Sequence, residues 1–153
     1  MTRQLLILVI IAAASVLSAF LPVEYFVSDA FRPPPNKVLT PEGIATVAYT
    51  PIWLYFWRIE VVYITLLFAA IVATFFVKPN PRTRWTLAML SIAAAFFHYL
   101  ALLFTSSPPG YGISLYPLVY TISIKNVTQY YLDIGQILMI YAAYNVYMAK
   151  RLS

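Results

Sequence analysis

Four long apolar stretches constrain this chain more than any other feature of its sequence. They cover residues 4–23, 52–77, 85–104 and 128–149, and each approaches the roughly 20 residues that a helix needs to cross a bilayer core of ~30 Å. Lipid offers no partner to an unpaired backbone group, and so few segments cannot close a barrel of strands, so each stretch is predicted to be a helix. The sequence therefore predicts an all-α integral membrane protein with four transmembrane helices in a single domain, residues 1–153.

Composition narrows the class of protein further. Charged residues make up only 10% of the chain and hydrophobic residues 62%, whereas about a quarter of a soluble domain is charged. A disordered chain and an ordinary cytosolic enzyme are therefore excluded. Because cysteine is absent, a disulfide scaffold, thiol redox chemistry and iron–sulfur clusters are excluded as well. No nucleotide-binding glycine motif and no nucleophile elbow is present.

The basic residues predict how the helices are oriented. One group lies at the termini and in the short loop 78–84, and comprises Arg3, Lys78, Arg82, Arg84, Lys150 and Arg151. The much longer loops 24–51 and 105–127 hold only Arg32, Lys37 and Lys125. Since basic loops stay in the cytoplasm, both termini and the short loop are predicted to be cytoplasmic and the long loops to lie outside. The protein is thus expected to be a multi-pass protein of the cell membrane that does not bind nucleic acid.

The first apolar stretch is expected to remain as a transmembrane helix. Arg3 precedes it, and Val16-Leu17-Ser18 resembles a signal-peptide cleavage site. The apolar run is nevertheless long enough to span the bilayer, which favours a retained helix.

The two outer loops are long enough to carry structure and are expected to form a small cap. Thr40-Pro41-Glu42 matches an N-cap followed by proline, which predicts a short helix over residues 41–48. Residues 119–124 are rich in Val, Tyr, Thr and Ile, which predicts a strand. Asn126-Val127-Thr128 is an N-glycosylation sequon, so Asn126 is a candidate for modification.

Several polar residues interrupt the last three predicted helices at a similar depth. At ~1.5 Å rise per residue, they lie about 10 Å below the outer ends of those helices. A charged group that faces lipid costs several kcal/mol, so these side chains are expected to turn inward or toward a partner protein. The candidate residues are Arg58, Glu60, His98, Asp133 and Gln136, together with Tyr63 and Tyr130.

Three interpretations of this polar layer remain open. The first is an interhelical network in which Asp133 or Glu60 accepts from His98, Arg58 or a tyrosine hydroxyl. The second is an outward-opening pocket for a lipid, a quinone or another amphipathic molecule. The third is a metal site of one histidine and two carboxylates, which the absence of a Glu-x-x-His pair disfavours, and no metal or cofactor is predicted. Arg58 is expected either to reach the outer headgroups or to pair with Asp133.

One resemblance covers two of the predicted helices. Pro51-Ile52-Trp53 is followed by Glu60, and then by Lys78 and His98. A four-helix protein with an aromatic-flanked acidic residue early in its second helix, a basic inner loop and a basic C-terminus is similar in outline to the emopamil-binding and sigma-2-receptor group. The resemblance implies a four-helix membrane fold, and neither activity nor site residues are carried over from it.

The predicted function is that of a non-catalytic accessory or structural subunit of a larger membrane complex, with a respiratory quinol or terminal oxidase as the expected kind. The chain is small, carries no catalytic motif and has two outer loops suited to docking. Its expected partners are membrane lipids and other membrane subunits, with quinone as a further candidate ligand. The alternative is a stand-alone lipid- or quinone-binding protein, or a membrane isomerase, that uses Glu60, His98 and Asp133. A small channel or proton path is the least favoured, because residues 52–77 offer only Thr65 and Thr74 toward the inner side.

Overall fold

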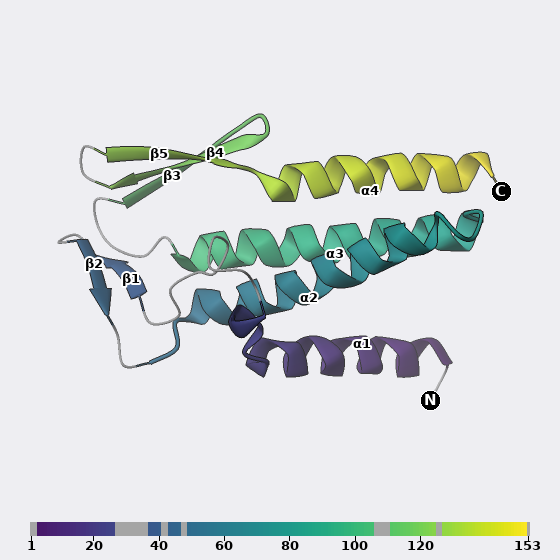
Figure 1. The fold of residues 1–153 in the computed structure, drawn as a ribbon, viewed down its shortest axis with the longest axis horizontal. Coiled ribbons are helices and arrows are strands. Elements are labelled where there is room, and N and C mark those ends of the chain that lie inside the picture. The colour runs from purple at the N-terminus through teal and green to yellow at the C-terminus, as the bar shows by residue number, and fades with distance from the viewer. Residues whose placement is uncertain are drawn as a thin grey trace.

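Helices run side by side in the computed structural model, and short strands lie at one end of them (Figure 1). The structure describes residues 3–26, 37–40, 43–46, 49–105, 111–124 and 127–152. Its helices are α1 (Arg3–Phe20), α2 (Ile52–Ala73), α3 (Pro81–Thr105) and α4 (Ile134–Arg151), with a short 3-10 helix, η1 (Val23–Tyr25), after α1. Its strands are β1 (Lys37–Thr40), β2 (Gly43–Thr46), β3 (Tyr111–Tyr116), β4 (Val119–Ile124) and β5 (Val127–Leu132). The described part of the chain is thus mostly helical.

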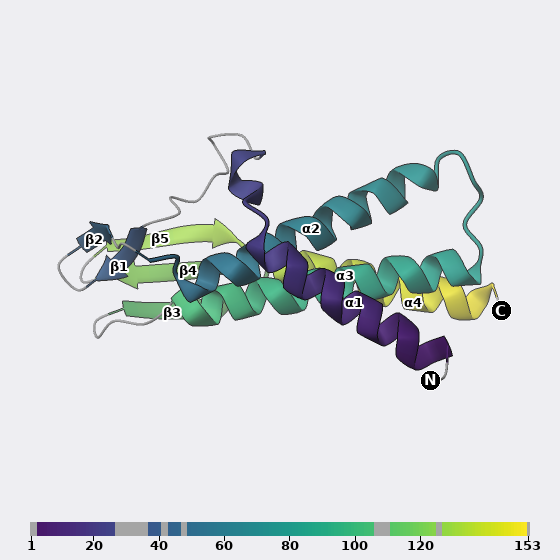
Figure 2. The same ribbon diagram turned by 90° about the horizontal axis from the view of Figure 1, so that it is seen from below.

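The helices pack in the order in which they occur in the chain. α1 lies against α2, α2 against α3, and α3 against α4. Both chain ends and the α2–α3 turn lie at one end of the molecule, and the strands lie at the other (Figure 1). Figure 2 shows that α2 diverges from α3 toward its C-terminal end. The helices therefore form an open row in which α3 has a neighbour on each side.

Small side chains bring α3 close to both of its neighbours. Ala94 and Ala95 of α3 pack with Leu67 of α2 and Leu138 of α4 in the buried core. Small residues let helix backbones approach closely, which favours association where the surrounding lipid is as apolar as the side chains. The buried core accordingly runs along α3, between α2 and α4.

Proline and polar caps determine where the two long helices begin and end. α3 begins at Pro81, and the Oδ1 atom of Asn80 accepts a hydrogen bond from the backbone N–H of Thr83 at 2.9 Å. The hydroxyl of Thr74 donates to the carbonyl of Ile71 at 2.7 Å, where α2 ends. The helices predicted over 52–77 and 85–104 are present, but the first ends at Ala73 and the second begins at Pro81.

Two of the helices are long and apolar enough to cross a membrane. They are α2 and α3, and only 17% of the most apolar stretch of α2 and 39% of that of α3 is buried within the chain. The core helix of a soluble protein would be mostly buried, whereas these helices expose large apolar side chains such as Phe68 and Met89. This exposure supports association with a membrane. In α1, residues Ile11–Phe20 form a shorter apolar segment.

A sheet is present, so the prediction of an all-α protein is wrong. β3, β4 and β5 form an antiparallel sheet with β4 at its centre, and β4 confirms the strand predicted over 119–124. The helix predicted over 128–149 begins only at Ile134. Residues 127–132 are rich in Val, Thr and Tyr, and they pair with β4 instead of extending the helix.

The short helix predicted over residues 41–48 is wrong for the part that the structure describes. Gly43–Thr46 forms β2, which pairs antiparallel with β1. Glycine is a poor helix former, and the cross-strand bonds to Lys37–Thr40 satisfy backbone groups that the helix would have used. Residues 41, 42, 47 and 48 lie outside the described residues.

The turn between β3 and β4 carries a strained residue. Tyr116 pairs with Val119, so Pro117 and Leu118 form the turn, and Leu118 has a φ of 61°. Proline followed by a residue of positive φ is the pattern of a type II turn, which normally has glycine at the second position. A residue with a Cβ loses about 1–2 kcal/mol in this conformation.

Replacing Leu118 with glycine is expected to raise the free energy of unfolding by roughly 0.5–1 kcal/mol, because glycine adopts positive φ without the clash but loses more chain entropy. Leu118→Val is expected to lower that free energy, since a β-branched residue fits the conformation least. Chemical denaturation in detergent, followed by circular dichroism, compares the two variants with the parent chain. A glycine variant less stable than the valine variant would contradict the inference that the backbone is strained at Leu118.

Candidate functional site

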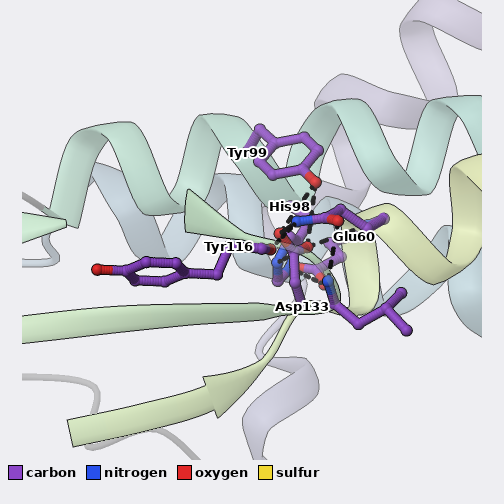
Figure 3. A network of polar contacts seen from close by, with 7 residues as sticks. Glu60, His98, Tyr99, Tyr116 and Asp133 are labelled. Carbon is purple, nitrogen blue, oxygen red and sulfur yellow. Dashed lines mark hydrogen bonds and ion pairs between the residues drawn. The ribbon is translucent and has the colours of Figure 1, made fainter. Parts of the chain in front are cut away.

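A network of buried polar side chains joins three helices at the end of the molecule that carries the strands (Figure 3). Glu60 comes from α2, His98 and Tyr99 come from α3, and Asp133 directly precedes α4. Glu60, His98 and Asp133 are each no more than 8% exposed. The structure thus brings together three residues that the sequence predicted to share one depth.

His98 lies between the two carboxylates. Its Nδ1 atom is 2.9 Å from Oε1 of Glu60, within hydrogen-bond distance. Its Nε2 atom is buried, lies 3.8 Å from Oδ1 of Asp133, and has no hydrogen-bond partner among the described residues. An imidazole held in this way links α2 to the start of α4.

Asp133 is fully buried, and its carboxylate accepts several hydrogen bonds. As the N-cap of α4, it accepts from the backbone N–H of Gln136 at 3.0 Å and from the Nε2 of Gln136 at 2.8 Å. The hydroxyl of Tyr99 donates to its two oxygens at 3.1 and 3.2 Å. A carboxylate is also favourable at a helix N-terminus because of the helix dipole. These bonds compensate for removing the charge from water.

The same site holds the sheet against the helices. Nε2 of Gln136 donates to the carbonyl of Tyr116 at 2.7 Å, and Oε1 of Gln136 accepts from the N–H of Leu118 at 3.0 Å. The N–H of Asp133 donates to the carbonyl of Leu118 at 2.9 Å. The ring of Tyr116 points away from the network (Figure 3). The strained β3–β4 turn is thus bound through its backbone to the first turn of α4.

Gly135 allows α4 to approach this closely. A Cβ at this position would lie 2.7 Å from Cζ of Tyr99 and 2.9 Å from Cδ2 of His98. Real Cβ contacts are not that short, so a larger residue would displace one of the two network side chains. Glycine is therefore required here by space.

Arg58 lies outside this network and is bound elsewhere. Its Nε and Nη2 atoms donate to the two carboxylate oxygens of Glu24 at 3.0 and 2.6 Å. Its Nη1 atom donates to the carbonyl of Ala19, at the end of α1, at 3.2 Å. Neither of the two expected pairings of Arg58, with Asp133 or with the outer headgroups, is what the structure shows. The bidentate pair ties α2 to the segment after α1.

The other candidate residues are dispersed. Tyr63 forms a hydrogen bond of 2.7 Å with the hydroxyl of Ser15 and stacks on Phe97, so it joins α1, α2 and α3 away from the network. Tyr130 is 74% exposed on β5. Asn126 lies outside the described residues. Within the part of the chain that the structure describes, no cluster of three His, Cys, Asp or Glu side chains is arranged to hold a metal ion.

Sequence reasoning missed Glu24 and Tyr99 as members of these sites. Glu24 directly follows the first apolar stretch and is the first acidic residue in the chain, which would have marked it as a partner for Arg58. Tyr99 is adjacent to His98, and its ring points toward α4, but its bond to Asp133 depends on the close approach that Gly135 permits. No sequence pattern predicts that approach.

Comparison with protein-family models, with curated proteins and with solved structures finds no match for this chain.

A double-mutant cycle is expected to identify Glu24 as the partner of Arg58. Each of Arg58→Ala and Glu24→Ala is expected to lower the free energy of unfolding by about 3–5 kcal/mol, because each leaves a buried charge unpaired. The double variant is expected to lose less unfolding free energy than the two single variants together, with a coupling energy of about 1–3 kcal/mol. Combining Arg58→Ala with Asp133→Ala provides the control. Additive losses for Arg58 and Glu24, measured by denaturation in detergent, would contradict the pairing.

Proposed function

We propose that all four helices cross the bilayer of the cell membrane, with both termini in the cytoplasm and the sheet outside. α1 and α4 each have 18 residues, a length of about 27 Å that suffices for a bilayer core. Both chain ends lie at the end of the molecule that carries the basic α2–α3 turn (Figure 1). That distribution of charge supports a cytoplasmic location of this end.

Within the membrane, the chain is proposed to act as a non-catalytic accessory or structural subunit of a larger complex. The observation that carries this proposal is the apolar surface of the sheet. The sheet lies beside the start of α4 and extends beyond the ends of α2 and α3 (Figure 1). It exposes the large side chains of Tyr116, Tyr130 and Leu132 on one face, and Leu118 is exposed in the adjoining turn. Exposed apolar groups in a contiguous region mark protein interfaces.

The polar network supports the same proposal. Glu60 binds His98, Asp133 binds Tyr99 and Gln136, and Arg58 binds Glu24. These ionisable groups are thus used to hold helices, sheet and η1 together, as expected of interhelical polar contacts in membrane proteins. A respiratory quinol or terminal oxidase remains the kind of complex that we favour, from the small size of the chain and its lack of a catalytic motif.

Extraction from native membranes in a mild detergent tests the subunit proposal. The chain is expected to migrate in a particle much larger than its own 17.3 kDa, with partner subunits in stoichiometric amounts by mass spectrometry. Tyr130→Lys is expected to release these partners, because it places a charge in the proposed interface. Tyr147→Lys, at an exposed tyrosine near the opposite end of α4, is the matched control. A protomer that is monodisperse and free of partners would contradict the proposal.

A second candidate function is the binding of a lipid or quinone head group, alone or in a membrane isomerase. It is favoured by the buried Nε2 atom of His98, which has no hydrogen-bond partner among the described residues. The centre of the Tyr120 ring lies 6.2 Å from the centre of the imidazole ring, so an aromatic side chain is close to His98.

Under this alternative, His98→Ala is expected to remove a bound lipid or quinone from the purified protein, because the head group loses its polar contact. Ser91→Ala, which removes a buried hydroxyl that donates to the carbonyl of Leu87 within α3, is expected to retain it. Solvent extraction and mass spectrometry of the purified variants measure the bound molecule. A His98→Ala protein that loses stability but keeps the same bound molecules would rule out this function.

A further inference from the structure

The end of the molecule opposite the sheet is strongly basic. Lys78 lies in the α2–α3 turn, Arg82 and Arg84 lie in the first turn of α3, and Lys150 and Arg151 lie in the last turn of α4. Figure 1 shows the turn and the C-terminus at this same end. The sequence contains no acidic residue between Glu60 and Asp133 and none after Asp133. None of these basic residues therefore has an acidic neighbour on its own helix or turn.

The side chain of Arg84 contacts α4. Its Nη1 atom donates to Oδ1 of Asn145 at 3.0 Å, and its guanidinium lies 5.8 Å from the ring centre of Tyr144. Asn145 is fully buried, and its own amide donates to the carbonyl of Tyr141 at 2.9 Å, which fixes its orientation. The Nε atom of Arg84 has no acceptor among the described residues. α4 therefore fixes the position of a guanidinium that keeps its positive charge.

Exposed apolar side chains surround the basic ones. Phe75, Phe76 and Val77 follow α2 and directly precede Lys78, and Trp85 follows Arg84. Phe75, Phe76 and Val77 are largely exposed, and Trp85 is 44% exposed. Aromatic residues beside lysine and arginine are typical of the zone where acyl chains meet headgroups. A free phosphate ion would use the cations alone, whereas a phospholipid uses both kinds of side chain.

We propose that this end of α3 and α4 binds the phosphate groups of anionic phospholipids in the leaflet that it faces. Arg84 is the fixed contact, and Lys78, Arg82, Lys150 and Arg151 supply the surrounding positive field. Basic sites between transmembrane helices recognise anionic headgroups in this way, and each basic side chain adds to the attraction. The inference rests on the proposed location of the chain in a membrane, and it does not require that the chain belong to a complex.

Titration of the detergent-solubilised full chain with a short-chain phosphatidylglycerol tests this inference. Isothermal calorimetry is expected to show tighter binding than for the matching phosphatidylcholine. The variant Arg82→Gln/Lys150→Gln removes two exposed charges without touching the Arg84–Asn145 contact. It is expected to bind phosphatidylglycerol about 25-fold more weakly, at roughly fivefold for each charge removed. Arg84→Gln is expected to weaken the binding of phosphatidylglycerol at least as much as the removal of one of these charges does, roughly fivefold.

Three controls separate the possible outcomes. Lys37→Gln removes a positive charge from β1, at the opposite end, and is expected to bind as the parent chain does. Inorganic phosphate at the same concentration is expected neither to bind measurably nor to displace the lipid. Equal affinity for the two lipids, displacement by inorganic phosphate, or an equal loss in the Lys37 variant would each overturn the proposal. Lipid selectivity in a chain that purifies without partners would refute the subunit function and leave this site intact.

Discussion

The fully buried carboxylate of Asp133 is the constraint on which the other contacts depend. A buried carboxylate without hydrogen bonds costs several kcal/mol, a large share of a domain's net stability, so the folded chain depends on its donors. Those donors are Gln136 in the first turn of α4 and Tyr99 of α3. Gln136 in turn binds the β3–β4 turn. The hydrogen bonds of Asp133 and Gln136 therefore fix three features together: the start of α4, its contact with α3 and the position of the sheet.

Each contact between neighbouring helices contains a polar anchor of this kind. The α1–α2 contact has Tyr63 bonded to Ser15, and α2–α3 has Glu60 bonded to His98. The α3–α4 contact is anchored at both ends, by Asp133 near the sheet and by Arg84 and Asn145 near the termini. In a membrane, where apolar side chains gain little specificity from one another, such bonds would select the register of the row. The double anchor agrees with α3 and α4 remaining together where α2 diverges (Figure 2).

The sequence predicted the long helices well because a span-length apolar run has few alternative structures. It failed at residues 127–132, where an aromatic and β-branched segment continues directly into an apolar helix and length alone cannot separate the two. The rise per residue of a helix predicted the common depth of Glu60, His98 and Asp133. It did not predict the partner of Arg58. That partner is Glu24, and its position depends on the short helix η1 that follows α1, which no helical periodicity encodes.

Opposite ends of the molecule carry opposite chemistry. Glu24, Glu60 and Asp133 lie toward the sheet, and each is buried against a donor. Lys78, Arg82, Lys150 and Arg151 lie toward the termini and are exposed. Among the described residues, the acidic groups near the sheet are paired and the basic groups near the termini are exposed, and protein interfaces exclude unpaired charge whereas an anionic leaflet attracts it. This difference is what the two proposals require, with a protein partner at the sheet end and lipid at the basic end.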